Sequence, residues 1–173
     1  MNRKILILLA LVTTVFLLSS CSSGGNKMMI SDDSDKKADA RMEQILNTLK
    51  NKDKDALKVM FSKKALSEAD NFEGQIDYLF DFFQGSVKSW ERTGFSSDGS
   101  IEYGKKSTML RSWYTVTTDK DKYRFFVIDY SADTINPDNA GLYTLRVIKA
   151  ADEATQFTYW QDMEIAGIYR PKE

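Results

Sequence analysis

The spacing of the apolar residues changes once along this chain, at Gly85, and this change limits the folds open to it. Before Gly85, apolar residues recur every three or four positions, as they do on one face of an amphipathic α-helix. After Gly85 they follow the two-residue period of β-strands. Helices followed by strands predict an α+β fold, in which N-terminal helices pack on one face of an antiparallel sheet.

Three helices are predicted before Gly85. The first places apolar residues on one helix face between positions 42 and 49. Asp53 is expected to cap a second, short helix. Asp70 and Glu73 have the spacing of a capping box at the start of a third helix, and Gly85 is a residue typical of the position after a helix end. The apolar stripe of the third helix, which we assign to the core, is Phe72, Ile76, Leu79, Phe80 and Phe83.

Four strands are predicted after Gly85, joined as a meander. The residues Ser96–Gly99 have the composition of a turn after the first strand, and a short piece at 101–103 is expected at a sheet edge. Residues 119–122 join two strands as a hairpin. The strand that follows is apolar on both faces, which predicts a central strand covered on both sides. The predicted strands span 87–93, 106–118, 123–131 and 141–150.

Residues 1–20 have the pattern of an export signal. Arg3 and Lys4 precede an apolar stretch at 5–18 that is short for a membrane-spanning helix. The sequence Leu-Ser-Ser-Cys then ends at Cys21 and resembles a bacterial lipobox, in which the cysteine is acylated and becomes the N-terminus. We therefore expect an extracytoplasmic lipoprotein anchored to the cell membrane through lipid on Cys21. The alternative is an ordinary signal peptide with a chance cysteine near its cleavage site.

The remaining chain divides into a tether and a domain. Residues 21–38 are small, polar and charged, which predicts a flexible tether. Residues 39–173 are enough for a single domain with one core, and the aromatic residues after position 150 are expected to fold back on it. Because residues 1–20 hold two basic and no acidic residues, their removal changes the net charge from −1 to −3. No basic block remains, so a nucleic-acid partner is not expected.

The residue types present exclude several kinds of chemistry. The chain has no histidine and one cysteine, so histidine-based nucleophilic sites and cysteine- or histidine-rich metal centres are excluded. With Cys21 assigned to the anchor, catalysis in the domain would have to rest on a carboxylate or a tyrosine. Glycine-rich phosphate loops and calcium loops are also missing from the sequence, and we expect no metal and no cofactor.

The helical segments at 41–53, 55–62 and 75–85, followed by the meander, resemble the nuclear transport factor 2-like superfamily, which has a cystatin-like cone. Within this superfamily the chain more closely resembles uncharacterised Gram-positive lipoproteins of this fold, over residues 38–150. The resemblance implies a curved sheet with a pocket between its concave face and the helices. This superfamily contains isomerases, dehydratases, transport factors and non-catalytic domains, so the resemblance predicts fold far better than activity.

Asp129 is the candidate catalytic residue, because a carboxylate that interrupts an apolar strand must be paired, hydrogen-bonded or protonated. The resemblance to ketosteroid isomerases implies a general base assisted by a tyrosine. The alternative is a structural ion pair with Arg111 or Arg146 on a neighbouring strand. Aromatic and charged residues of the strands are candidate ligand-binding residues, unless they serve only the core and the sheet surface. These candidates are Trp90, Arg111, Trp113, Tyr123, Asp129, Tyr143 and Arg146.

Taken together, these patterns favour a non-enzymatic binding module on the membrane surface. Its expected partner is a small apolar or amphiphilic molecule or an envelope protein. The first alternative is an isomerase-like enzyme that uses Asp129 and a tyrosine for proton transfer. The second is an accessory domain for cell-wall synthesis, as the resemblance to modules of this fold on transpeptidases implies.

Overall fold

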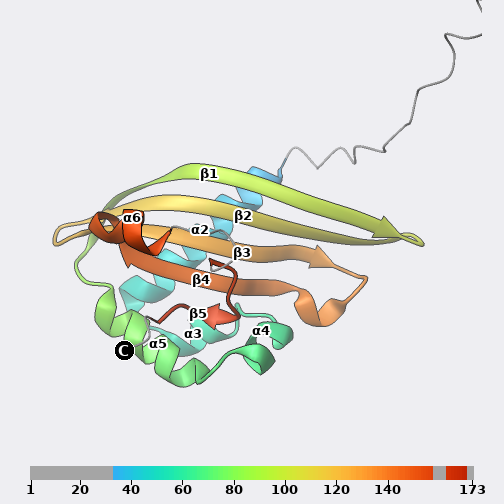
Figure 1. Cartoon of the computed structure of the whole chain (residues 1–173), viewed down its shortest axis with the longest axis horizontal. Helices are drawn as coiled ribbons and strands as arrows, with labels where there is room; N and C mark the ends of the chain where they lie inside the picture. The colour runs from blue at the N-terminus through green and yellow to red at the C-terminus, as the bar shows by residue number, and fades with distance from the viewer. Residues whose placement is uncertain (1–32, 158–162, 171–173) are drawn as a thin grey trace, which may run out of the picture.

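The computed structural model describes residues 33–157 and 163–170. It confirms the predicted α+β fold: helices lead the chain and a curved, open sheet follows, with strand order β1-β2-β3-β4-β5 (Figure 1). All neighbouring strands are antiparallel except β4 and β5, which are parallel. The strands are β1 (Val87–Glu102), β2 (Lys105–Thr118), β3 (Lys122–Asp133), β4 (Gly141–Lys149) and β5 (Gly167–Ile168). The helices are α2 (Ser34–Asn51), α3 (Lys54–Lys58), α4 (Lys63–Glu68), α5 (Phe72–Phe82) and α6 (Glu153–Gln156), with 3-10 turns η1 (Pro137–Asn139) and η2 (Ala150–Asp152).

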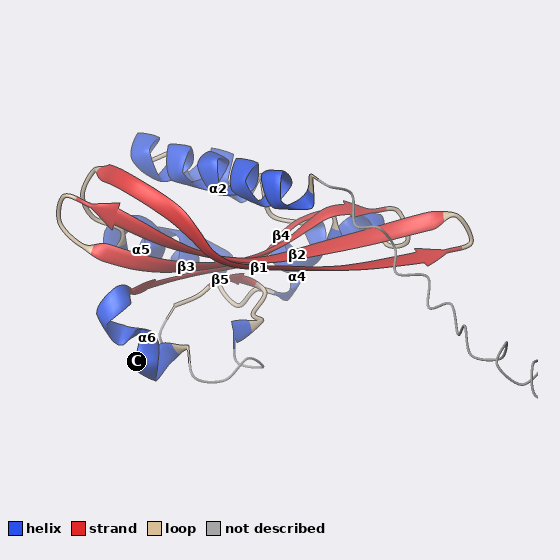
Figure 2. Cartoon of the chain, turned by 90° about the horizontal axis from the view of Figure 1, so that it is seen from above, coloured by secondary structure: helices blue, strands red, loops and turns tan. Residues whose placement is uncertain are grey.

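Helix α2 lies along one face of the sheet, and α6 lies on the opposite side (Figure 2). Because α2 begins at Ser34, the predicted tether boundary at residue 38 is wrong, and residues 34–38 belong to the folded domain. Contacts with the sheet explain this early start. Arg92 of β1 donates to the backbone carbonyl of Asp35 and forms ion pairs with the carboxylates of Asp35 and Asp39.

The helix ends follow the capping rules with two differences from the prediction. Asp53 caps α3 as expected, accepting the Ala56 N–H. At α5 the cap is Asn71 rather than Asp70, because Asn71 takes the left-handed conformation that asparagine tolerates and accepts the Gly74 N–H. Helix α5 ends at Phe82, so Gly85 is not its terminating glycine. Helix α4, which was not predicted, is capped by the Ser62 hydroxyl.

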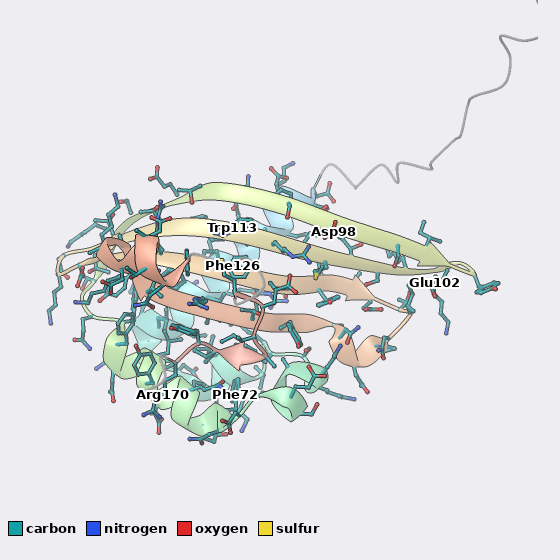
Figure 3. The ribbon with its side chains drawn as sticks, in the orientation of Figure 1. Phe72, Asp98, Glu102, Trp113, Phe126 and Arg170 are labelled. Atoms are coloured by element: carbon teal, nitrogen blue, oxygen red, sulfur yellow. The ribbon has the colours of Figure 1, made fainter. Side chains whose placement is uncertain are left out.

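The predicted turn at Ser96–Gly99 is wrong, because these residues continue β1 and pair with Thr108–Arg111 of β2. The chain reverses instead at Tyr103 and Gly104, which both have positive φ, as a two-residue hairpin turn requires. The separate edge piece predicted at 101–103 is therefore the end of this same hairpin. Its tip is marked by Glu102 in Figure 3.

The main core lies between the helices and one face of the sheet. Strand β3 is central, as predicted, and both of its faces are covered. Phe125 points to the helices, whereas Phe126 and Ile128 lie in a second apolar cluster on the opposite face with Met163. The main core includes Met42, Ile45, Leu57, Ile76, Tyr114, Phe125, Leu142 and Leu145.

Residues 163–170 fold back on the domain, as predicted for the C-terminal segment. The Tyr169 N–H donates to the Leu145 carbonyl over 2.9 Å, and the Ile168 N–H donates to the Gln75 side chain over 2.9 Å. The segment is thereby held against both β4 and α5. Within the described residues, none of the helices combines the length and the apolar character needed to cross a bilayer. Cys21 lies outside the described residues.

Candidate functional site

A cleft of about 760 Å³ opens where the C-terminal end of α2, the end of α5, the start of β1 and the β2–β3 turn meet. Its volume is within the range of about 300–1,000 Å³ that small-molecule sites occupy. The apolar part of its lining combines buried side chains of α2 with half-buried ones of α5, of the residue that follows α5 and of β1. These apolar residues are Leu46, Leu49, Phe80, Phe83, Val87 and Trp90.

Local structure fixes the elements around the cleft. Helix α2 ends because Lys52 adopts the left-handed conformation, and the Lys52 N–H donates to the Leu49 carbonyl. On the other side, the Asp119 carboxylate accepts the Ser86 N–H over 2.7 Å, which ties the β2–β3 turn to the start of β1. The Trp90 indole packs edge-on against Tyr114, at a ring-centroid distance of 5.7 Å. The cleft is therefore bounded by elements that are hydrogen-bonded or packed to one another.

The charged residues of the cleft are mostly basic. Lys50 and Lys52 come from the end of α2, and Lys120 comes from the β2–β3 turn, whereas Glu43 is the acidic residue of the lining. All four side chains are exposed. Within the part of the chain that the structure describes, none of the three lysines forms an ion pair. The cleft therefore combines an apolar lining with positive charge that is available to a ligand.

Trp90 is the predicted ligand-binding residue that the structure places in the cleft. Tyr123 is buried on the helix side of the sheet. Its hydroxyl accepts the Gln84 N–H over 2.9 Å. Gln84 itself lines the cleft. Tyr123 is thus a supporting residue, which holds the segment that follows α5 against the sheet.

Asp129 is buried, with 3% of its surface exposed, and it pairs with a residue that the sequence did not indicate. The Arg41 Nε of α2 donates to the Asp129 Oδ1 over 3.1 Å. The expected alternatives, Arg111 and Arg146, are therefore wrong as its partners. Burial raises the pKa of the Asp129 carboxyl, and the charge and hydrogen bond of Arg41 oppose this shift. Asp129 is not among the residues that line the cleft.

Arg111, Trp113 and Arg146 point to the opposite face of the sheet and do not join the cleft. Trp113 packs on Phe126 at a ring-centroid distance of 4.9 Å, and Figure 3 shows the two side chains on neighbouring strands. The Arg146 guanidinium lies 3.7 Å from the centre of the Tyr169 ring, and it donates to the Gln156 carbonyl. These residues attach the C-terminal segment to the sheet.

Arg111 and Tyr143 also serve contacts outside the cleft. Arg111 forms ion pairs with Asp98 of β1 and Glu164 of the C-terminal segment. Tyr143 lies at the bulge where β3 and β4 change register. Its hydroxyl donates to the Glu68 carboxylate over 2.8 Å. Burial and this hydrogen bond raise the pKa of Tyr143 to about 12, so the hydroxyl keeps its proton at neutral pH.

The predicted candidates are therefore split between two faces of the sheet, and the residues that sequence reasoning missed are the lysines. Lys50 and Lys52 stand at a helix end and Lys120 in a hairpin turn, which are ordinary places for solvated lysines. The one feature that these lysines share in the sequence is their position at the end of a predicted helix or strand. Among the described residues, no group of three or more acidic, histidine or cysteine side chains is placed to hold a metal ion.

The helices and the sheet around the cleft define an α+β domain with a ligand-sized site at one end. The chain belongs to the family described as a domain of unknown function, DUF5104, whose profile matches residues 44–150. Every cleft residue except Glu43 lies inside the matched segment. No curated protein matches the chain significantly.

Proposed function

We propose that this protein is a membrane-anchored lipoprotein of the nuclear transport factor 2-like superfamily, and that its domain binds a small ligand without transforming it. The observation that carries the binding function is the cleft between α2, α5 and β1, with its apolar lining and with lysines that form no ion pair among the described residues. An apolar concavity with a few polar groups at its edge is the usual form of a small-molecule site.

The proposed anchor rests on the N-terminal sequence. A basic pair, an apolar stretch and a Leu-Ser-Ser-Cys motif stand in the order expected of a lipoprotein signal. The folded domain begins at Ser34, so residues 22–33 separate Cys21 from the first described helix. This order of segments supports a domain that is tethered next to the membrane, outside the cytoplasm.

Binding is favoured over catalysis by the position of the one candidate base. Asp129 has the raised pKa that a general base needs, but its carboxylate is held by Arg41 in the interior. The lining of the cleft contains Glu43 as its carboxylate, and Glu43 is exposed on the rim. The candidate base Asp129 therefore lies outside the cleft, whereas apolar surface and positive charge line it.

The anchor is tested by labelling cells that express the protein with a radioactive fatty acid. The wild-type protein should be labelled and found in the membrane fraction. Cys21→Ala should lose the label. Cys21→Ser, whose side chain is closest in shape to cysteine, should lose it as well. Equal labelling of the wild type and Cys21→Ala would show that Cys21 is not the site of acylation.

The binding function is tested with the chain from residue 21 onward carrying Cys21→Ala, which retains every residue that the structure describes. Probe binding is followed by tryptophan fluorescence, because Trp90 lines the cleft. Phe83→Asp puts a charge into the apolar lining and should reduce binding at least tenfold. Phe95→Asp, at an exposed phenylalanine outside the cleft, should leave binding unchanged. Equal effects of the two substitutions would argue against the cleft.

A further inference from the structure

The three lysines of the cleft have no acidic partner among the described residues, whereas five of the eleven other described lysines do. Lys54, Lys58 and Lys149 each pair with a carboxylate, with Asp77, Glu73 and Asp121 respectively. Lys50, Lys52 and Lys120 converge on one cleft from two separate parts of the chain. Three unpaired positive charges at one site raise the local potential, although the whole chain carries a net charge of −1.

The carboxylates nearest to these lysines in the sequence are engaged elsewhere. Asp53, which follows Lys52, caps α3 through the Ala56 N–H. Asp119 accepts the Ser86 N–H, and Asp121 pairs with Lys149 over 2.7 Å. The acidic neighbours on both sides of Lys120 are thus held by other groups. None of these three carboxylates forms an ion pair with Lys50, Lys52 or Lys120, which leaves the positive charge to an incoming group.

The same cleft presents apolar surface that the fold does not cover. Phe80, Phe83, Val87 and Trp90 are each only half-buried, although they pack against the main core. A simple anion would use the lysines and leave this surface in water. A neutral apolar molecule would cover the surface and leave the lysines unused. A molecule that satisfies both has an apolar body and an anionic head.

We propose that the cleft binds a small anionic amphiphile, with its carboxylate or phosphate head near Lys50, Lys52 and Lys120 and its apolar body against Phe83 and Trp90. This inference rests on the proposed binding function and names the ligand class. A carboxylate head and a phosphate head share the chemistry that lysine recognises, because both are compact anionic oxygen groups.

The test uses four probes that share a dodecyl chain, each below its micelle concentration: dodecanoate, dodecyl phosphate, dodecyl maltoside and dodecyltrimethylammonium. The chain from residue 21 with Cys21→Ala is titrated, and Trp90→Phe identifies the part of the fluorescence change that comes from the cleft. The anionic probes should bind at least threefold more tightly than the neutral probe, and the cationic probe most weakly. A preference between the two anions identifies the head group, and either preference supports the proposal.

Substitutions at the rim separate charge from apolar contact. Lys50→Gln with Lys120→Gln should weaken dodecanoate binding about three- to tenfold, since each exposed ion pair contributes about 0.2–1 kcal/mol. The same double variant should bind dodecyl maltoside like the wild type. Lys36→Gln with Lys88→Gln removes equal charge outside the cleft and should have little effect. Glu43→Gln should tighten dodecanoate binding about twofold.

Two different failures are distinguishable. If anionic and neutral probes bind with equal affinity, and the lysine variants match the wild type, the inference about charge is overturned while the binding cleft stands. If no dodecyl probe changes the Trp90 fluorescence, and no probe raises the thermal midpoint of the protein, the inference and the proposed binding function both fail.

Discussion

The Arg41 guanidinium of α2 donates to the Asp129 carboxylate of β3 over 3.1 Å and joins the first helix to the centre of the sheet. The two residues are 88 positions apart in the chain. Asp129 is almost fully buried, whereas about a quarter of the Arg41 side chain is exposed. Arg41 therefore compensates a carboxylate that would otherwise lie unpaired in the interior, and this explains why an acidic residue is tolerated in an apolar strand.

Arg41→Met should destabilise the protein by about 1–3 kcal/mol at pH 7. The substitution keeps the apolar stem of the side chain but leaves the buried Asp129 without its partner. Urea denaturation followed by circular dichroism measures the free energy of unfolding. Lys36→Met, on the exposed side of the same helix, is the control and should change it by less than about 0.5 kcal/mol. A loss at Arg41 no larger than that at Lys36 would show that the ion pair does not stabilise the fold.

The stability of the wild type relative to Asp129→Asn should decrease as pH rises. Burial raises the pKa of Asp129 above its unfolded value of 3.8. Below pH 3.8 both states keep the proton, and the contribution of Asp129 is fully present. As pH rises from 3.8 through the folded-state pKa, the unfolded state releases its proton first, so the contribution is lost. Asn does not titrate, which makes Asp129→Asn the reference.

The measurement is urea denaturation of both proteins at several values between pH 4 and pH 7. Arg41→Met should make the decrease larger, because Arg41 holds the pKa of Asp129 down against burial. A difference that instead grows with rising pH would mean that the pKa of Asp129 is lowered in the folded protein.

Gly141→Ala should destabilise the protein more than Gly104→Ala does, by at least about 1 kcal/mol. Gly141 has a φ of +119°, and a Cβ there would lie 2.8 Å from the Met60 carbonyl oxygen. The segment after α3 pairs with the start of β4 at this point, so the backbone has little freedom to move. Gly104 also has positive φ, but a Cβ there meets nothing within 4 Å. Thermal unfolding measures the loss of stability in both variants. Equal losses would show that the clash with the Met60 carbonyl does not add to the cost of positive φ.

Ile76→Ala should cost about 2–5 kcal/mol, because this α5 residue is 1% exposed in the main core. Val59→Ala is the matched control, because Val59 is 80% exposed and should change stability by less than about 0.5 kcal/mol. Urea denaturation measures both. A small loss at Ile76 would mean that α5 is not packed on the sheet as described.

Elements with their own local signal were predictable from the sequence. The apolar spacing at 42–49 identified the face of α2 that is buried, and Asp53 identified the start of α3. Helix α4 was missed because its six residues are too few to show a period. The turn expected at Ser96–Gly99 failed because pairing with β2 overrides the turn preference of serine, aspartate and glycine.

The candidate site was less predictable, because it depends on which elements meet. Trp90 was identified from its residue type, whereas Lys50 and Lys120 carry no signal until the end of α2 and the β2–β3 turn are brought together. The partner of Asp129 was sought on neighbouring strands and lies on a helix instead. Strand-pairing rules predict contacts between neighbouring strands. They do not predict contacts between a strand and a helix that packs across the sheet.

Nuclear magnetic resonance shows directly whether the cleft is the ligand site. Dodecanoate is titrated into the ¹⁵N-labelled chain from residue 21 with Cys21→Ala, and shifts of amide and indole N–H signals are mapped onto the structure. We predict that the largest shifts occur at the Trp90 indole and at the amides of Phe83, Gly85 and Lys120. Largest shifts around Trp113 and Phe126 would show that dodecanoate binds to the opposite face of the sheet, and an unchanged spectrum would show that it does not bind to the domain.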